Sequence, residues 1–104
     1  MAVAQIRCNY LLFYDVVPDY AVKRTPYRGS HLEYAQKAVD RGELILGGAL
    51  ANPIDASVLL FRASSPQIVE DFARGDPYVR NKVVTKWRVR EWTTVIGKDA
   101  QNRV

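Results

Sequence analysis

Hydrophobic residues along the chain gather in runs with two different spacings, which predict strands and helices. Cys8 to Val17 is dense in aromatic and branched residues, as expected of a strand buried on both faces. Glu43 to Ala51 and Ser57 to Arg62 are further apolar runs, and the turn-forming Asn52 to Asp55 between them predicts a hairpin. Lys86 to Ile96 alternates apolar residues with arginines, which predicts a last strand with unlike faces.

Two segments carry helical signals. Thr25-Pro26 predicts an N-cap followed by proline in the first turn, and this helix should run to about Arg41 and stop at Gly42. Ser64 to Gln67 predicts a second helix that opens with a capping box, and Gly75 predicts its end. The order strand, helix, strand, strand, helix, strand predicts an α+β protein with the ferredoxin-like βαββαβ plan and an antiparallel four-stranded sheet.

In this plan helices cover one face of the sheet, although the strands offer large apolar residues in both directions. We therefore expect two sheets to pair face to face in a homodimer, a dimeric α/β barrel. A monomer with a wet, ligand-binding face is the alternative. One domain over residues 8–96 is expected, with an N-terminal lead-in of residues 1–7 and a flexible C-terminal tail of residues 97–104.

Composition and charge argue against several classes of protein. The chain has 104 residues, a net charge of +4 and one cysteine, Cys8, which cannot form an internal disulfide. No apolar run is long enough to cross a bilayer, and the first residues do not resemble a secretory signal, so we expect a cytoplasmic protein without membrane contact. Nucleic-acid binding is disfavoured because the cations are dispersed and no RNA-recognition motif occurs, whereas a small anionic molecule is a possible guest.

The single histidine, His31, is the main candidate for chemistry. On the predicted helix it faces inward, in line with two alanines. Asp76, far along the chain, is its candidate partner, because a histidine oriented by an aspartate is the simplest general base that a small protein can build. A structural alternative exists for each: a core histidine that bonds a backbone carbonyl, and a turn-forming aspartate ahead of Pro77.

Four more residues are candidates for substrate binding. Arg28 lies three residues before the histidine, so its guanidinium could hold a substrate carboxylate, although an ordinary surface ion pair fits equally well. Tyr78 could add a hydroxyl to the pocket, although an aromatic residue after a turn more often serves packing, and Tyr14 in the first strand is a further candidate. Gly48, next to Gly47 inside a strand, indicates a bulge or a backbone approached closely by a ligand or partner.

Metal and cofactor chemistry are not expected. One histidine and one cysteine on separate elements cannot supply the clustered ligands of a zinc site. No serine or cysteine nucleophile motif occurs, and the paired glycines are not followed by the helix start that a nucleotide-binding loop requires.

The chain resembles the YciI-like (YCII-related) family of dimeric α/β-barrel proteins. It departs from the family pattern at Ala49, where proline is usual, and at Asp55-Ala56, where a glycine commonly completes the hairpin. The resemblance implies a pocket lined by the histidine and the aspartate, in a family with members that eliminate chloride from small ring-cleavage products. It rests on the first strand, Arg28, His31, Gly42, Gly47 to Leu50 and Asp76-Pro77.

The resulting hypothesis is a cofactor-independent lyase or isomerase. In it Asp76 fixes the tautomer of His31, His31 moves a proton on a small anionic substrate, and Arg28 holds the substrate. The competing hypothesis is a non-catalytic dimeric module that binds a metabolite or a protein. RNA binding by the sheet is the weakest of the three.

Overall fold

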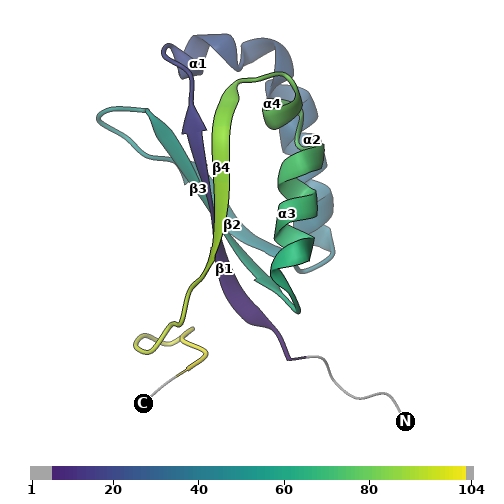
Figure 1. The fold of residues 1–104 in the computed structure, drawn as a ribbon, viewed down its shortest axis with the longest axis vertical. Coiled ribbons are helices and arrows are strands. Elements are labelled where there is room, and N and C mark those ends of the chain that lie inside the picture. The colour runs from purple at the N-terminus through teal and green to yellow at the C-terminus, as the bar shows by residue number, and fades with distance from the viewer. Residues whose placement is uncertain (1–5, 103–104) are drawn as a thin grey trace.

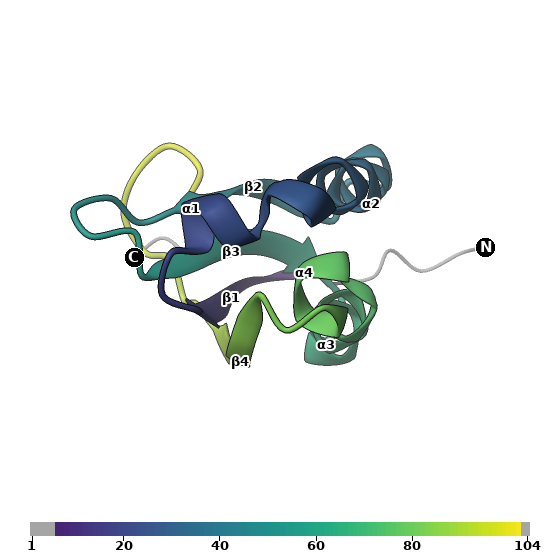
Figure 2. The ribbon, with the colours of Figure 1, turned by 90° about the horizontal axis from the view of Figure 1, so that it is seen from above.

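The computed structural model describes residues 6–102. Its strands form one antiparallel sheet in the order β2-β3-β1-β4, and helices cover one face of it (Figures 1 and 2). The predicted α+β, ferredoxin-like plan is confirmed. The elements are β1 (Cys8–Val16), α1 (Tyr20–Lys23), the 3-10 helix η1 (Thr25–Tyr27), α2 (Arg28–Asp40), β2 (Leu44–Ala49), β3 (Ala56–Ala63), α3 (Pro66–Gly75), α4 (Pro77–Arg80) and β4 (Val84–Glu91).

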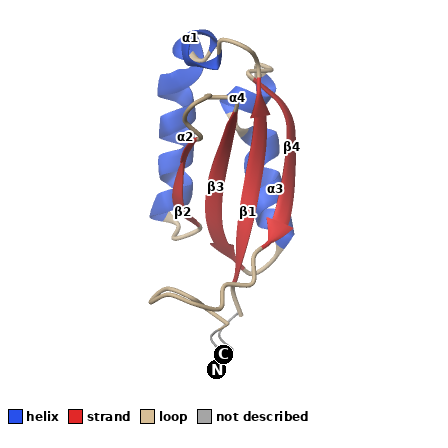
Figure 3. Cartoon of the chain, turned by 90° about the vertical axis from the view of Figure 1, so that its left-hand side faces the viewer, coloured by secondary structure: helices blue, strands red, loops and turns tan. Residues whose placement is uncertain are grey.

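The two faces of the sheet differ in burial. On the central strand β1, Tyr10, Leu12 and Tyr14 are buried under the helices, as the period of two along a strand requires. Leu11 and Phe13 on the opposite face are only half-buried, because no helix lies over that face (Figure 3). The predicted burial of this strand on both faces is therefore wrong for the single chain.

The two long helices contribute unequally to the core. Helix α3 buries Val69, Phe72 and Ala73, and the Phe72 ring meets the Phe61 ring of β3 at 4.9 Å between centroids. Helix α2 buries only Ala38 completely. Because α2 inserts few large side chains, space remains between it and the edge strand β2.

Two predicted helix caps are wrong. Thr25 does not cap the long helix: it begins η1, its hydroxyl donates to the Ala21 carbonyl, and α2 starts at Arg28 without a side-chain cap. No capping box forms at the start of α3, where Ser65 is the N-cap and makes no side-chain cap bond. This N-cap places Gln67 one position too early to close the box, and its amide instead donates to Asp71.

The hairpin and the end of α2 are as predicted, whereas the last strand is shorter than predicted. The β2–β3 hairpin is confirmed, and Gly42 ends α2 with a positive φ of 76°. The last strand starts at Val84 and stops at Glu91, five residues before the predicted end, because β1, on which it pairs, begins at Cys8.

The glycines of β2 do not form the predicted bulge. The register shift of this strand falls between Leu44 and Leu46. Gly47 is instead approached by Leu59, whose Cγ would lie 3.0 Å from an added Cβ. The close approach that glycine permits here thus comes from a neighbouring strand.

The chain ends carry two further predictions. Residues 1–5 of the predicted lead-in lie outside the described part of the chain. At the other end the backbone N–H of Asn102 donates to the carbonyl of Thr94, and flexibility of the tail stays a prediction. No helix within residues 6–102 has the length and apolar character needed to cross a membrane.

Candidate functional site

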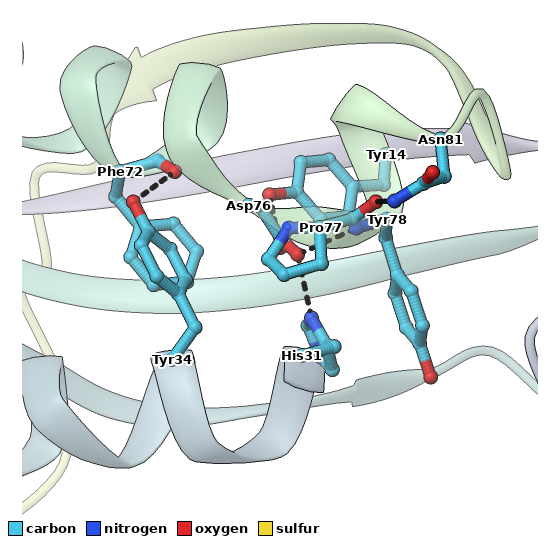
Figure 4. A network of polar contacts seen from close by, with 8 residues as sticks. All are labelled: Tyr14, His31, Tyr34, Phe72, Asp76, Pro77, Tyr78 and Asn81. Atoms are coloured by element: carbon cyan, nitrogen blue, oxygen red, sulfur yellow. Dashed lines mark hydrogen bonds and ion pairs between the residues drawn. The ribbon is translucent and has the colours of Figure 1, made fainter. Parts of the chain in front are cut away.

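Asp76 is the centre of a buried polar cluster between β1, α2 and α4 (Figure 4). Its side chain is 0% exposed and accepts three hydrogen bonds. The Tyr14 hydroxyl donates to Oδ2 at 2.7 Å, whereas His31 Nδ1 at 2.8 Å and the backbone N–H of Tyr78 at 2.9 Å reach Oδ1. A buried carboxylate needs such partners, because burying it unpaired would be costly.

Local sequence explains why the carboxylate sits there. Asp76 precedes Pro77, which favours extended backbone, and it adopts φ −65° and ψ 126° as the N-cap of α4. Pro77 then occupies the first helical position, where its missing N–H costs nothing. Gly75 leaves room for Tyr34, whose hydroxyl would collide with a Cβ at that position and donates to the Phe72 carbonyl at 2.8 Å.

The contact between His31 and Asp76 fixes the tautomer of the imidazole. An ionised carboxylate can only accept hydrogen bonds, so Nδ1 carries the shared proton, and in the neutral ring Nε2 then holds the lone pair. The His31 side chain is 14% exposed and lines a cavity. The arrangement therefore has the elements of a general base: an orienting carboxylate and a basic nitrogen within reach of a ligand.

Burial and charge keep the neighbouring hydroxyls protonated. Burial raises the pKa of Tyr14 far above its usual value, and the negative charge of Asp76 raises it further. Burial and the same carboxylate also raise the pKa of Tyr34. Tyr14 is thus a permanent hydrogen-bond donor to the dyad.

Aromatic rings hold His31 from the side. Its ring stacks on Tyr78 with 3.8 Å between centroids and an interplanar angle of 6°. The ring of Tyr20 meets Tyr78 edge-on at 5.9 Å, and the Arg24 guanidinium lies 4.9 Å from the Tyr20 ring centroid. These contacts form one continuous wall from the imidazole to Arg24.

The cavity beside this wall has a volume of about 480 Å³, a size typical of small-molecule sites. It lies between α2 and the β2–β3 hairpin, and Arg28 and Gly48 line it together with His31, Tyr14 and Tyr78. The fold thus gathers the six predicted site residues, with Asp76 directly behind the histidine. Their roles stay predictions.

Sequence reasoning missed two residues of the cavity. In the sequence Arg24 is one of several dispersed cations, and no pattern distinguishes Tyr20. Both precede the Thr25-Pro26 break, and they line the cavity because α1 and η1 fold the chain back over it. Helical spacing cannot relate Arg24 to His31, because the 3-10 turn η1 lies between them, so no pattern in the sequence places Arg24 at the cavity.

The wall and the cavity offer few metal ligands. No group of three or more His, Cys, Asp or Glu residues that could hold a metal ion occurs within residues 6–102. Of the side chains around the cavity, the charged ones are arginines, and no carboxylate lines it directly. The described site thus favours an anionic organic guest over a cation.

Comparison with known proteins identifies the family. No curated protein matches the chain. A structure of 5-chloro-2-hydroxyhydroquinone dehydrochlorinase from Burkholderia phenoliruptrix AC1100, in complex with 2,5-dihydroxybenzoquinone, is similar with a TM-score of 0.70 and 20% identity over 89% of this chain and 99% of that chain. The likeness shows a shared fold. The family model of the YCII-related domain matches residues 8–93, so the chain belongs to the YCII-related family.

Proposed function

We propose that the protein is a cofactor-independent lyase or isomerase in which His31 is the general base. The observation that carries the proposal is the 2.8 Å contact of His31 Nδ1 with the buried Asp76 carboxylate, which leaves the Nε2 lone pair available to the cavity. Proton transfer by a positioned side chain contributes about 10²–10⁴-fold to a reaction rate.

The chemistry follows from that lone pair. Nε2 takes a proton from an acidic C–H or O–H of the substrate, and Asp76 stabilises the imidazolium that results. The electron pair left behind either expels a leaving group such as chloride, which completes an elimination, or shifts within a conjugated system and is reprotonated at another carbon, which completes an isomerisation. In the elimination the proton leaves the imidazolium for solvent, so the net loss is HCl.

The substrate is a small anionic, unsaturated compound. Arg28 supplies a positive charge at the cavity, apolar residues of α2 and β2 supply the walls, and Gly48 leaves a part of the wall without a side chain. The similar dehydrochlorinase, whose named substrate and bound quinone are hydroxylated rings, supports the same class of guest. Tyr14 acts through Asp76 as a positioning residue, because its hydroxyl is already committed to the carboxylate.

A turnover screen tests the proposal. Chlorinated and hydroxylated quinols, 5-chloro-2-hydroxyhydroquinone among them, and small unsaturated acids are incubated with the protein in D₂O. Chloride release and deuterium incorporation are then followed. We expect His31→Ala to lose at least about 100-fold in rate, and Glu33→Ala, on the solvent side of the same helix, to keep the wild-type rate. Equal rates for wild type and His31→Ala would refute the proposal.

Dimerisation is part of the same proposal. The open face of the sheet carries the half-buried Leu11, Phe13, Val58 and Leu60, and a second copy of the same face would cover them isologously. Sedimentation analysis should give a dimer for the wild type and a monomer for Leu60→Glu. Val22→Glu, at a residue 72% exposed on α1, is the matched control and should stay dimeric. A wild-type monomer at tens of micromolar would contradict this part.

A binding module without catalysis is the second candidate. The observation that favours it is the structural role of Asp76, which caps α4 and makes hydrogen bonds with Tyr14 of β1 and His31 of α2. Because these bonds stabilise the fold, the dyad would also form in a protein that catalyses no reaction. This candidate predicts saturable binding of 2,5-dihydroxybenzoquinone with no turnover of any compound in the screen. Turnover that depends on His31 would exclude it.

A further inference from the structure

The Tyr78 hydroxyl is the one buried side-chain polar atom within residues 6–102 that has no hydrogen-bond partner. The residue is 2% exposed and lines the same cavity as His31. A buried hydroxyl without a partner costs about 1–3 kcal/mol. Such a group calls for an explanation, and a role in ligand binding is a common one.

The position of this hydroxyl is fixed from several sides. The backbone N–H of Tyr78 is held by Asp76, the ring is stacked on His31, and Tyr20 meets it edge-on. Figure 4 shows the Tyr78 hydroxyl pointing away from Asp76, on the far side of its ring from the dyad. The donor is therefore preorganised and is not occupied by the polar cluster behind it.

Two guanidinium groups face the same space. Arg24, over the Tyr20 ring, and Arg28, at the start of α2, both line the cavity, and neither forms an ion pair with another described residue. Burial raises the pKa of Tyr78 and Tyr20 adds to the rise. The positive charges of Arg28 and Arg24 oppose it, and so does the Arg28 side chain acting on the hydroxyl as a donor, although its geometry falls short of a regular hydrogen bond. Both arginines thus act electrostatically at the hydroxyl.

We propose that the Tyr78 hydroxyl, flanked by Arg24 and Arg28, is an oxyanion subsite that binds the phenolate or enolate oxygen of a planar, conjugated ring compound. This deepens the proposed function, on which it rests for the reaction itself. The hydroxyl donates to the anionic oxygen, the arginines neutralise its charge, and the imidazole stacked beside Tyr78 faces the same ring. A neutral ring gains none of these contacts and should be rejected.

The subsite can be tested by binding alone, with 4-nitrophenol as the probe, because only its ionised form absorbs strongly at visible wavelengths. At a pH where the free probe is mostly unionised, wild-type protein should raise the phenolate absorbance saturably. 4-Nitroanisole, which cannot ionise, should bind at least about ten-fold more weakly.

Two variants separate the subsite from general packing. Tyr78→Phe keeps the stacked ring, and we expect it to weaken phenolate binding about ten-fold or more while the urea midpoint stays equal or rises. Arg24→Gln should also weaken binding, whereas Arg80→Gln, at an exposed cation on α4 away from the cavity, should bind as the wild type does.

Two outcomes would overturn the subsite. One is equal affinity of the wild type for 4-nitrophenol and 4-nitroanisole. The other is that Tyr78→Phe binds the phenolate as tightly as the wild type does. Its failure is distinguishable from failure of the proposed function. Phenolate binding that needs Tyr78, without His31-dependent turnover in the screen, would leave the subsite standing and remove the reaction. Turnover that needs His31 but not Tyr78 would support the reaction and overturn the subsite.

Discussion

Buried polar groups at the two ends of the site differ in whether they have hydrogen-bond partners. At one end, both oxygens of Asp76 are matched by donors from β1, α2 and α4. At the other end, the Tyr78 hydroxyl is buried without a partner, beside two arginines that form no described ion pair. The two groups are only two residues apart in the chain, so the difference does not reflect their general depth in the fold.

This contrast separates positioning from binding. A fully matched carboxylate stabilises the fold and holds His31 in one tautomer, so it is complete before a ligand arrives. An unmatched buried donor costs stability in the free protein, and this donor and the two arginines gain a partner when an anion enters. Substitutions at the two ends should therefore have opposite signatures.

The largest effect is expected for Asp76→Ala. It removes the N-cap of α4 and the acceptor of two buried donors, so the free energy of unfolding should fall by about 3 kcal/mol. Asp71→Ala is the control, since Asp71 is exposed on α3 and makes only surface contacts, a hydrogen bond from Gln67 and an ion pair with Arg74. It should change stability by less than about 0.5 kcal/mol. Urea denaturation measures both. Similar losses for the two variants would show that the buried hydrogen bonds of Asp76 do not stabilise the fold.

Gly75→Ala should be the next largest. The new Cβ would collide with the Tyr34 hydroxyl and displace the Tyr34 ring, which packs on Phe72. Overpacking of this kind costs about 1–3 kcal/mol. Gly29→Ala, on the open first turns of α2, meets nothing within 4 Å and should stabilise the protein by up to about 1 kcal/mol. The same sign for both variants would contradict the close approach at Gly75.

A matched pair of tyrosine variants sharpens the comparison directly. Tyr14→Phe removes a hydrogen bond to the buried carboxylate and should lower the free energy of unfolding by about 1.5 kcal/mol. Tyr78→Phe removes a hydroxyl that has no partner, and it should be neutral or stabilising. Thermal or urea unfolding measures the change in stability for both variants. Equal losses would show that the two hydroxyls do not differ in their hydrogen bonding.

The smallest expected effect is on alkaline stability. The pKa of Tyr14 is raised in the folded state, so above pH of about 10 the unfolded chain loses this proton first. The stability from this group is complete below pH of about 10 and is lost as the pH rises toward the folded pKa. In Tyr14→Phe the fall above pH 10 should be shallower, by at most about 1.4 kcal/mol per pH unit. An unchanged slope would show that Tyr14 does not contribute.

Much of this site could be predicted from the sequence, because its signals are local. Helical periodicity placed His31 on the inner side of α2, and an aspartate ahead of a proline indicated a fixed turn where Asp76 stands. The helix starts were less predictable, since capping depends on which residue becomes the N-cap, and a shift of one position removed the bond expected of Gln67.

The remaining features depend on contacts between distant segments. Gly75 ends α3, as its residue type predicts, but nothing in the sequence indicates that Tyr34 fills the space beside it. Arg24 lay beyond a proline break, and only the packing of α1 brings it to the cavity. That Tyr14 bonds to Asp76 follows from sheet geometry and from the position of α4, neither of which a linear pattern records.

The most direct test of the account is a long-range ¹H–¹⁵N correlation spectrum of the His31 ring, which gives an unambiguous signal because the chain has one histidine. We predict that the neutral form of the ring carries its proton on Nδ1, and that the Nε2 signal shifts when 2,5-dihydroxybenzoquinone is added while the Nδ1 signal stays unchanged. A neutral ring with its proton on Nε2, or an Nε2 signal indifferent to the ligand, would contradict the claim that Asp76 orients His31 to act as a base in the cavity.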